Sequence, residues 1–232
     1  MIKELRRRAI LDRVRVKSGG FPIDGLVSYY KLDETTGSVI DSIGGNNGTN
    51  NGMTRGVSGK LGNCYKGNGT GWVNLNWKGE QAGGLYCESN RQFSLSFWLN
   101  HFSSTDVGQY ISRATNTSAD RTFHFAYNAG RFSIFARGAL SDYLNIPINQ
   151  WVFITVTWNG TAAILYVNGL FSQLLNVGIA PENINQNINI ASRTDGLFIL
   201  QNGLIDDVGF WDKPLNQTEI TQLYNNGNGI TL

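Results

Sequence analysis

The fold class is decided by the stretch Trp151-Val-Phe-Ile-Thr-Val-Thr-Trp-Asn-Gly-Thr-Ala-Ala-Ile-Leu-Tyr-Val-Asn-Gly169. Residues 151–158 are rich in β-branched and aromatic residues, which favour a strand. Asn159-Gly160 is the dipeptide typical of a tight hairpin turn, after which the chain returns as a second strand. The next Asn-Gly pair leads into Leu170–Leu175. The stretch therefore predicts three consecutive antiparallel strands.

The same kind of pattern extends to both sides of this stretch. In residues 93–100, Phe and Leu occupy every second position, and Ser94, Ser96 and Trp98 lie between them. This alternation predicts a strand with one apolar face. Further runs of strand composition are residues 26–32, 71–75, 121–127, 131–137, 188–192 and 203–211. Turn and loop segments rich in Gly and Asn separate them, such as the loop of residues 41–49. We therefore predict an all-β protein built as a two-sheet antiparallel jelly-roll sandwich.

The chain of 232 residues is 41% hydrophobic and 16% charged, which fits a globular protein with a sizeable core. Residues 1–17 hold seven basic and two acidic residues, a net charge of +5, whereas the whole chain carries +2. The chain thus joins a basic arm to a mildly acidic body. No apolar run is long enough for membrane insertion, and no apolar stretch follows the charged start, as a signal peptide would require.

We predict two parts, a basic N-terminal arm and linker over residues 1–24 and a single domain over residues 25–232. Ile2, Leu5 and Ala9 share one face of a predicted short helix within residues 1–17. This amphipathic pattern favours an arm that anchors the protein to a partner or forms homo-oligomers. The alternatives are a solvated leader and a contact with nucleic acid, which would be unspecific because no aromatic residues are interleaved with the charges.

A second helix is predicted near the C-terminus. Asn216 is a suitable N-cap, and Glu219 three residues later completes a capping box. The apolar stripe consists of Ile220, Leu223 and Tyr224. Asn225-Asn226-Gly227 supplies the stop signal.

Three segments together resemble the laminin-G-like, concanavalin A-like lectin/glucanase superfamily. They are Gly25–Asp33 with the 41–48 loop, the hairpin of residues 151–169, and the closing segment 203–224. The resemblance implies the same two-sheet jelly roll. The arginine-rich leader before such a domain resembles leaders of phage-encoded structural proteins.

The sequence offers little for catalysis. Glycan hydrolysis needs two carboxylates roughly 5–10 Å apart. The acidic pairs Asp33-Glu34 and Asp206-Asp207 are adjacent, and adjacent residues of a strand face opposite ways. His101 and His124 do not lie in a nucleophile motif, and His124 is predicted on a solvent-facing side of its strand. We therefore expect no enzyme, and a glycan hydrolase or lyase is the least favoured alternative.

The resemblance implies a structural calcium ion between the first loop and the closing strand, with Asp41 and Asp206 as ligands. Calcium prefers carboxylate and carbonyl oxygens. Asp206 is predicted to share an inward face with Val208 and Phe210, where a buried carboxylate needs compensation. The alternative is that Asp41 makes an Asx-turn and Asp206 accepts backbone N–H bonds. Both readings stay open at this point.

Sugar binding, the usual activity of the resembling family, would use exposed aromatic rings and polar loops. Trp72, Trp77 and the Asn and Asp residues of the 103–120 loop are candidates, although no individual ligand-binding residue is assigned. The other tryptophans are predicted in the core or at its rim: Trp98, Trp151, Trp158 and Trp211. Cys64 and Cys87 are predicted as unpaired thiols, with one bridge between them as the alternative.

The sequence therefore predicts a non-catalytic virion surface protein of a phage, either a decoration protein or a fibre. Residues 1–17 would hold other virion proteins or further copies of the chain, and the jelly roll would face outward and bind glycans. No specific nucleic-acid partner is expected. The alternative is an extracellular bacterial carbohydrate-binding module.

Overall fold

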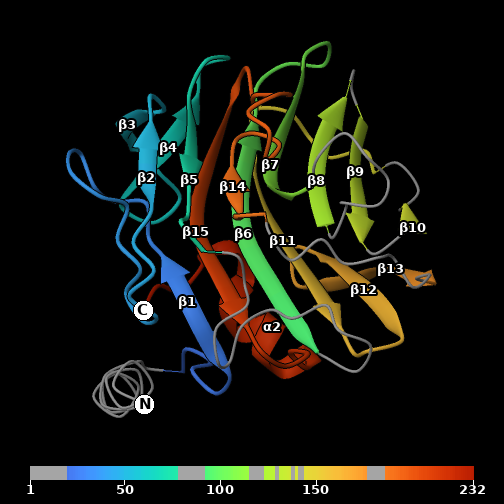
Figure 1. Ribbon diagram of the computed structural model, residues 1–232. Coiled ribbons are helices and arrows are strands. Elements are labelled where there is room, and N and C mark those ends of the chain that lie inside the picture. Colours follow the sequence, from blue (N-terminus) through green and yellow to red (C-terminus); the bar gives the residue numbers. More distant parts are fainter. Residues whose placement is uncertain are drawn as a thin grey trace.

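The computed structural model describes residues 20–77, 92–114, 123–128, 131–136, 139–140, 144–176 and 186–232. These residues form a sandwich of two antiparallel sheets, with one short α-helix near the C-terminus (Figure 1). The helix predicted over residues 1–17 lies outside the described residues. Among the described residues, no helix has the length and apolar composition that crossing a membrane requires.

One sheet has eight strands. In spatial order they are β13 (Leu170–Asn176), β12 (Ala162–Val167), β11 (Trp151–Trp158), β6 (Phe93–His101), β15 (Gly203–Trp211), β4 (Asn63–Gly67) and β3 (Thr54–Ser58), with β1 (Leu26–Tyr30) also paired to β15. The predicted meander is confirmed, because β11, β12 and β13 are consecutive neighbours joined by Asn-Gly turns.

The other sheet has seven strands. In spatial order they are β10 (Ala139–Leu140), β9 (Arg131–Ala136), β8 (Phe123–Asn128), β7 (Val107–Arg113), β14 (Asn189–Ile190), β5 (Trp72–Asn74) and β2 (Thr49–Asn51). Neighbours are far apart in sequence in several cases, so this sheet forms only when distant segments meet. Its pairing is antiparallel throughout the described strands.

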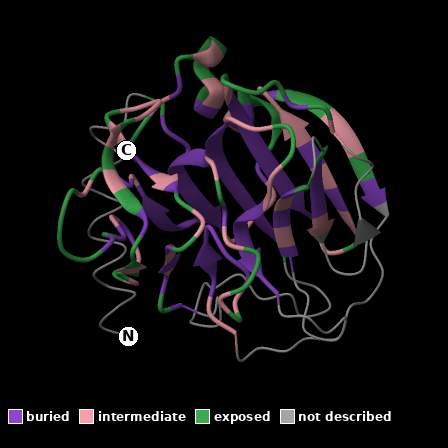
Figure 2. Ribbon diagram, turned by 90° about the horizontal axis from the view of Figure 1, so that it is seen from above, coloured by how far each residue is buried: buried purple, intermediate pink, exposed green. Residues whose placement is uncertain are grey.

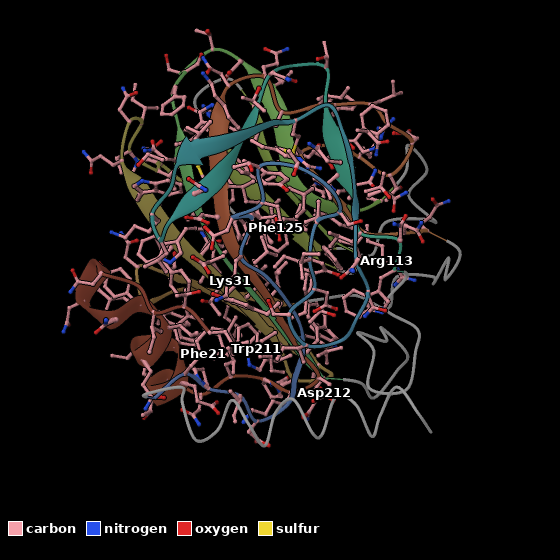
Figure 3. The ribbon with its side chains drawn as sticks, turned by 90° about the vertical axis from the view of Figure 1, so that its left-hand side faces the viewer. Phe21, Lys31, Arg113, Phe125, Trp211 and Asp212 are labelled. Atoms are coloured by element: carbon pink, nitrogen blue, oxygen red, sulfur yellow. The ribbon has the colours of Figure 1, made fainter. Side chains whose placement is uncertain are left out.

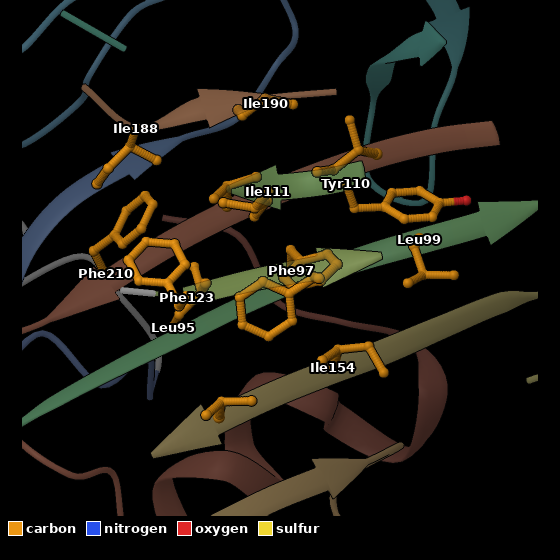
Figure 4. Close-up of a cluster of buried hydrophobic side chains, with 14 of the residues drawn as sticks. Leu95, Phe97, Leu99, Tyr110, Ile111, Phe123, Ile154, Ile188, Ile190 and Phe210 are labelled. Atoms are coloured by element: carbon orange, nitrogen blue, oxygen red, sulfur yellow. The ribbon is translucent and has the colours of Figure 1, made fainter. Parts of the chain in front are cut away.

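The main core fills the space between the two sheets, where Figure 2 shows the buried residues. Phe97 of β6 lies near its centre, with its ring centroid 5.3 Å from that of Phe125 on β8, in a T-shaped arrangement (Figure 4). Leu95 and Leu99 point to the same side, so the alternation predicted for residues 93–100 is confirmed. Edge-to-face packing of buried rings adds to the stabilisation that their burial provides.

A second core lies on the outer face of the eight-stranded sheet, beneath helix α2 (Gln217–Tyr224). Phe21 and Trp211 lie together on this side, away from Arg113 (Figure 3). The Trp211 indole N–H donates a 2.7 Å hydrogen bond to the carbonyl of Pro22. Part of the segment predicted as a linker thus packs against the sheet. The domain boundary after residue 24 stays a prediction.

Helix α2 begins and ends as predicted. The side chain of Asn216 accepts the N–H of Glu219 at 3.0 Å, and the Glu219 carboxylate accepts the N–H of Asn216 at 2.9 Å. This reciprocal pair is the capping box. Asn225 ends the helix in the left-handed region, with φ of 47°.

Replacing Asn216 with alanine is expected to lower the free energy of unfolding by about 1 kcal/mol, because the first turn loses its side-chain acceptor. Urea unfolding of both proteins measures the change. Thr218→Ala is the matched control, since Thr218 is exposed in the same turn and outside the capping pair. Equal losses for the two variants would contradict this role of the cap.

Five of the described strands were not predicted from the sequence, and one of them, β10, has only two residues. β2, β3 and β4 are short and mostly polar, and β2 and β3 are edge strands, so alternation is weak there. The fifth, β7, lies in the segment predicted as the 103–120 loop. That prediction was wrong for Val107–Arg113, which form a buried strand of the seven-stranded sheet. A bulge between Gln109 and Ile111 interrupts the alternation there.

Candidate functional site

The outer face of the seven-stranded sheet carries a continuous row of mostly polar side chains. Directly opposed residues of neighbouring strands project to the same face. The registers place Thr49, Asn74, Asn189, Ser112, His124 and Phe135 in one line across six strands, from β2 to β9. We call these six residues the polar row. Five strand spacings make it about 24 Å long.

The row faces away from the core. The residues that alternate with it along the strands belong to the core between the sheets: Val73, Ile111, Phe123, Phe125, Ile134 and Ile190. Gln109 lies opposite Ala126 and therefore shares the outward face with the row. The six residues include no carboxylate. This sheet face therefore carries amide, hydroxyl and imidazole groups, of which those of Ser112, Asn189 and Gln109 are buried.

Two oxygens at the centre of this face have no hydrogen-bond partner. They are the hydroxyl of Ser112 and the side-chain carbonyl of Gln109, and both side chains are buried. A buried polar atom without a partner costs about 1–3 kcal/mol. In native proteins such an atom usually meets a water or a bound group. Unpaired hydrogen-bonding capacity is therefore concentrated at the middle of the row.

The neighbouring amides are held in fixed orientations. The Asn189 amide donates to the Ser192 hydroxyl and to the Arg193 carbonyl, both at 3.1 Å. The Asn74 carbonyl oxygen accepts from the Asn187 amide at 3.1 Å. These bonds pre-orient two amides of the row, which lowers the entropy cost of binding a ligand there.

The two tryptophan candidates lie on opposite faces of their sheet. Trp72 pairs with Asn51 at the outward side of β5 and is half-buried. Trp77 is 2% exposed and packs edge-on against Phe210 at 5.4 Å, within the core. The candidacy of Trp77 as a sugar-stacking residue is therefore wrong.

The other four tryptophans lie as predicted. Trp98, Trp158 and Trp211 are buried, and Trp151 packs partly buried against the second core.

The two histidines occupy different environments. The ring nitrogens of His101 lie 2.8 Å from the Tyr110 hydroxyl and 2.8 Å from an Asp106 oxygen. His101 is fully buried, and burial lowers its pKa more than the Asp106 carboxylate raises it. His124 is half-buried on the outer sheet face, with its ring stacked on Phe135 at 5.1 Å. Of the two, only His124 is partly open to a ligand in solvent.

Of the polar residues in the predicted 103–120 loop, Asp106 is tied to His101. Residues 115–120 lie outside the described part of the chain.

Asp41 holds the first loop together through backbone N–H groups. One carboxylate oxygen accepts those of Tyr29, Ile43 and Gly44, each at 3.0 Å. The other accepts the N–H of Asn46 at 3.0 Å. This is the Asx-turn alternative, extended to four backbone donors and the side-chain amide of Asn46.

Asp206 does not lie on the predicted face. It is buried, as expected, but it pairs with Trp98 of β6, which belongs to the second core. A bulge between Asp206 and Gly209 inserts one extra residue, and Asp207 takes a φ of 47°. Asp206 therefore points away from Val208 and the core between the sheets. The prediction of a shared inward face was wrong because the bulge shifts the alternation.

The bulge also brings the two adjacent carboxylates to one side of the sheet. Asp206 accepts the N–H groups of Lys60 and Leu61 at 2.7 and 3.0 Å. Asp207 accepts the hydroxyls of Tyr29 and Thr231, which also lie on the outer side. The rule that adjacent strand residues face opposite ways does not hold at this pair. Burial, together with the charge of Asp207, raises the pKa of Asp206.

The donors around Asp41 and Asp206 are N–H groups rather than oxygens. A cation at these carboxylates would meet the positive ends of those dipoles, so the contacts give calcium no support at either residue. The two aspartates also accept hydrogen bonds from different loops, residues 43–46 for Asp41 and residues 60–61 for Asp206. Within the described residues, no group of three or more His, Cys, Asp or Glu is placed to hold a metal ion. Calcium stays a prediction.

Cys64 is a buried free thiol whose pKa is raised by burial to about 12, so it remains protonated at neutral pH. Cys87 lies outside the described residues.

Comparison with known proteins points to one superfamily. The model of the concanavalin A-like lectin/glucanases superfamily matches residues 66–221. A Trypanosoma rangeli sialidase, solved with 2,3-difluorosialic acid, gives a TM-score of 0.70 at 14% identity, covering 98% of this chain and 39% of the sialidase. The binding domain of botulinum neurotoxin serotype D gives 0.65 at 17% identity, covering 87% and 52%. Such identities show a shared fold alone. No curated protein matches the sequence.

Proposed function

The chain belongs to the concanavalin A-like lectin/glucanase superfamily, and from this premise we propose that it is a non-catalytic glycan-binding domain. Its ligand lies on the outer face of the seven-stranded sheet, along the polar row and beside Trp72. The row forms hydrogen bonds with sugar hydroxyls, and the Trp72 indole stacks on the apolar face of a sugar ring.

The observation that carries this proposal is the unpaired hydrogen-bonding capacity at the centre of the row. Ser112 and Gln109 keep buried oxygens without partners, between amides that are already oriented. Sugar hydroxyls both donate and accept, so they match a surface that mixes hydroxyl, amide and imidazole groups. A half-buried tryptophan at the end of such a row adds an apolar contact with a fixed orientation.

The absence of catalysis is part of the proposal. The adjacent carboxylates Asp206 and Asp207 lie on β15 of the other sheet and are buried. Both carboxylates accept hydrogen bonds from neighbouring protein groups, and this orientation favours a structural role. A glycan bound along the polar row would not meet them.

Location and assembly stay predictions. The sialidase and the neurotoxin binding domain are much longer than this chain, so what they bind supports the glycan class without naming the sugar. The virion surface, like the anchoring role of residues 1–17, depends on residues outside the described part. The extracellular alternative stands beside it.

Replacing Trp72 with alanine is expected to weaken glycan binding by about tenfold or more, because a partly buried aromatic anchor is lost. Isothermal titration with soluble xylan, β-glucan, mannan and sialyllactose measures the affinity for the wild type and the variant. Ser112→Ala is expected to weaken binding as well, while leaving the free energy of unfolding unchanged or higher, because it removes an oxygen without a partner.

Thr155→Val is the matched control for Ser112→Ala. Thr155 also has a buried hydroxyl without a partner, but it lies on β11 of the eight-stranded sheet. Its replacement should leave glycan affinity unchanged. Binding that survives Trp72→Ala and Ser112→Ala, or that disappears equally with Thr155→Val, would argue against this face.

A further inference from the structure

The loop between β14 and β15 carries two large apolar side chains in solvent. Leu197 is 56% exposed and Phe198 is 55% exposed. Phe198 also adopts a φ of 51°, in the left-handed region that bulky residues rarely occupy. Unfavourable backbone conformations of this kind cluster at functional sites, so the exposed Phe198 is a candidate for a binding role.

The Phe198 ring is held from one side by an arginine. The guanidinium carbon of Arg193 lies 4.8 Å from the ring centroid. Arg193 is itself 5% exposed, and its Nε and Nη2 atoms donate to the carboxylate of Asp195 at 2.8 and 2.6 Å. The guanidinium therefore has a fixed plane, and a cation over the ring stabilises the ring position. Phe198 thus presents a pre-oriented aromatic surface.

The same loop is joined to the polar row. The Phe198 carbonyl accepts the N–H of Gln109 at 3.1 Å, and the Arg193 carbonyl accepts the Asn189 amide at 3.1 Å. On the other side of the loop, a Cβ placed on Gly196 would lie 4.0 Å from the Trp72 ring. The loop therefore stands between Trp72 and the centre of the row.

We propose that Phe198, supported by Arg193, is a second sugar-stacking subsite. This inference rests on the proposed function and deepens it: the ligand is a glycan chain, with one sugar ring on Trp72 and another on Phe198, rather than a single terminal sugar. A polar pair lies beside the ring, since the Arg193 guanidinium lies over it and donates to the Asp195 carboxylate. An oriented ring beside polar groups suits a sugar, which has apolar and hydroxyl-bearing faces.

The experiment is titration of the full chain with laminari-, xylo- and manno-oligosaccharides from monosaccharide to hexasaccharide. Wild-type affinity should rise with chain length. Phe198→Ala should weaken binding of the hexasaccharide that binds best by about tenfold and leave monosaccharide binding unchanged. Phe198→Tyr, which keeps a ring, should stay within about twofold of the wild type.

Phe171→Ala is the matched control, because Phe171 is 61% exposed on the edge strand β13 of the other sheet. It should bind as the wild type does. If Trp72→Ala weakens binding and Phe198→Ala does not, the subsite is wrong and the proposed function stands. If the wild type binds none of these oligosaccharides and none of the polysaccharides above, the proposed function fails, and the subsite fails with it.

Discussion

Replacing Trp211 with alanine is expected to lower the free energy of unfolding by about 4 kcal/mol, the usual cost of deleting a fully buried tryptophan side chain. Trp211 is fully buried at the end of β15, and its ring stacks on Phe21 at 6.3 Å. The variant also leaves the carbonyl of Pro22 without its donor. Urea unfolding followed by far-ultraviolet circular dichroism measures the loss.

The same variant tests whether the second core belongs to the folding unit. If Phe21 and Pro22 are part of one cooperative domain, unfolding stays a single transition with a lower midpoint. Trp211→Phe should recover part of the loss, because the phenyl ring restores much of the apolar volume. It does not restore the N–H donor to the Pro22 carbonyl. A loss below about 1 kcal/mol for Trp211→Ala would show that the outer core contributes little to stability.

The second large change in the free energy of unfolding is expected on raising the pH, and it comes from the carboxylate pair Asp206 and Asp207 on the β15 bulge. Burial raises the pKa of both Asp206 and Asp207 above the value of an unfolded chain. The folded state therefore binds protons more tightly than the unfolded state. The stability from these groups is fully present below pH 4 and is lost as the pH rises through their folded pKa values. One pKa unit corresponds to about 1.4 kcal/mol, so we expect a loss of at least that size between pH 4 and pH 8.

Other groups titrate in the opposite sense, so the comparison must be between variants. The pKa of His101 is lowered by burial, so its contribution to stability increases as the pH rises from the lowered value to the ordinary value and is complete above it. In Asp207→Asn, the free energy of unfolding should fall less between pH 4 and pH 8 than it does in the wild type. Asp195→Asn is the control. The hydrogen bond from Arg193 lowers the pKa of Asp195, so this group changes the stability only at acidic pH. A profile that Asp207→Asn leaves unchanged would contradict this assignment.

The sequence predicts the fold where alternation and turn residues agree. The meander from Trp151 to Leu175 and the capping box of α2 require only neighbouring residues, and both were predicted correctly. The short strands β2 and β10 could not be predicted, because two or three residues carry no readable period. They form because the longer strand β9 and the more distant strand β5 supply their hydrogen-bonding partners.

The candidate site was harder to predict from the sequence, because it also depends on contacts between distant segments. The polar row needs the registers of six strands from distant parts of the chain, and no local pattern specifies them. The bulge at Asp207 reversed the predicted face of Asp206, since one inserted residue shifts the alternation. Trp72 was a correct candidate for an outward-facing ring, whereas Trp77 follows the end of β5 and the left-handed Asn76 and is buried in the core.

A glycan bound on the outer face of the seven-stranded sheet can be located by a nuclear magnetic resonance titration of the isotope-labelled full chain with the oligosaccharide that binds best in the series above. We expect the largest chemical-shift changes at Gln109, Ser112, Asn189 and the Trp72 indole. Changes confined to α2, β13 and the rest of the eight-stranded sheet would contradict glycan binding on this face.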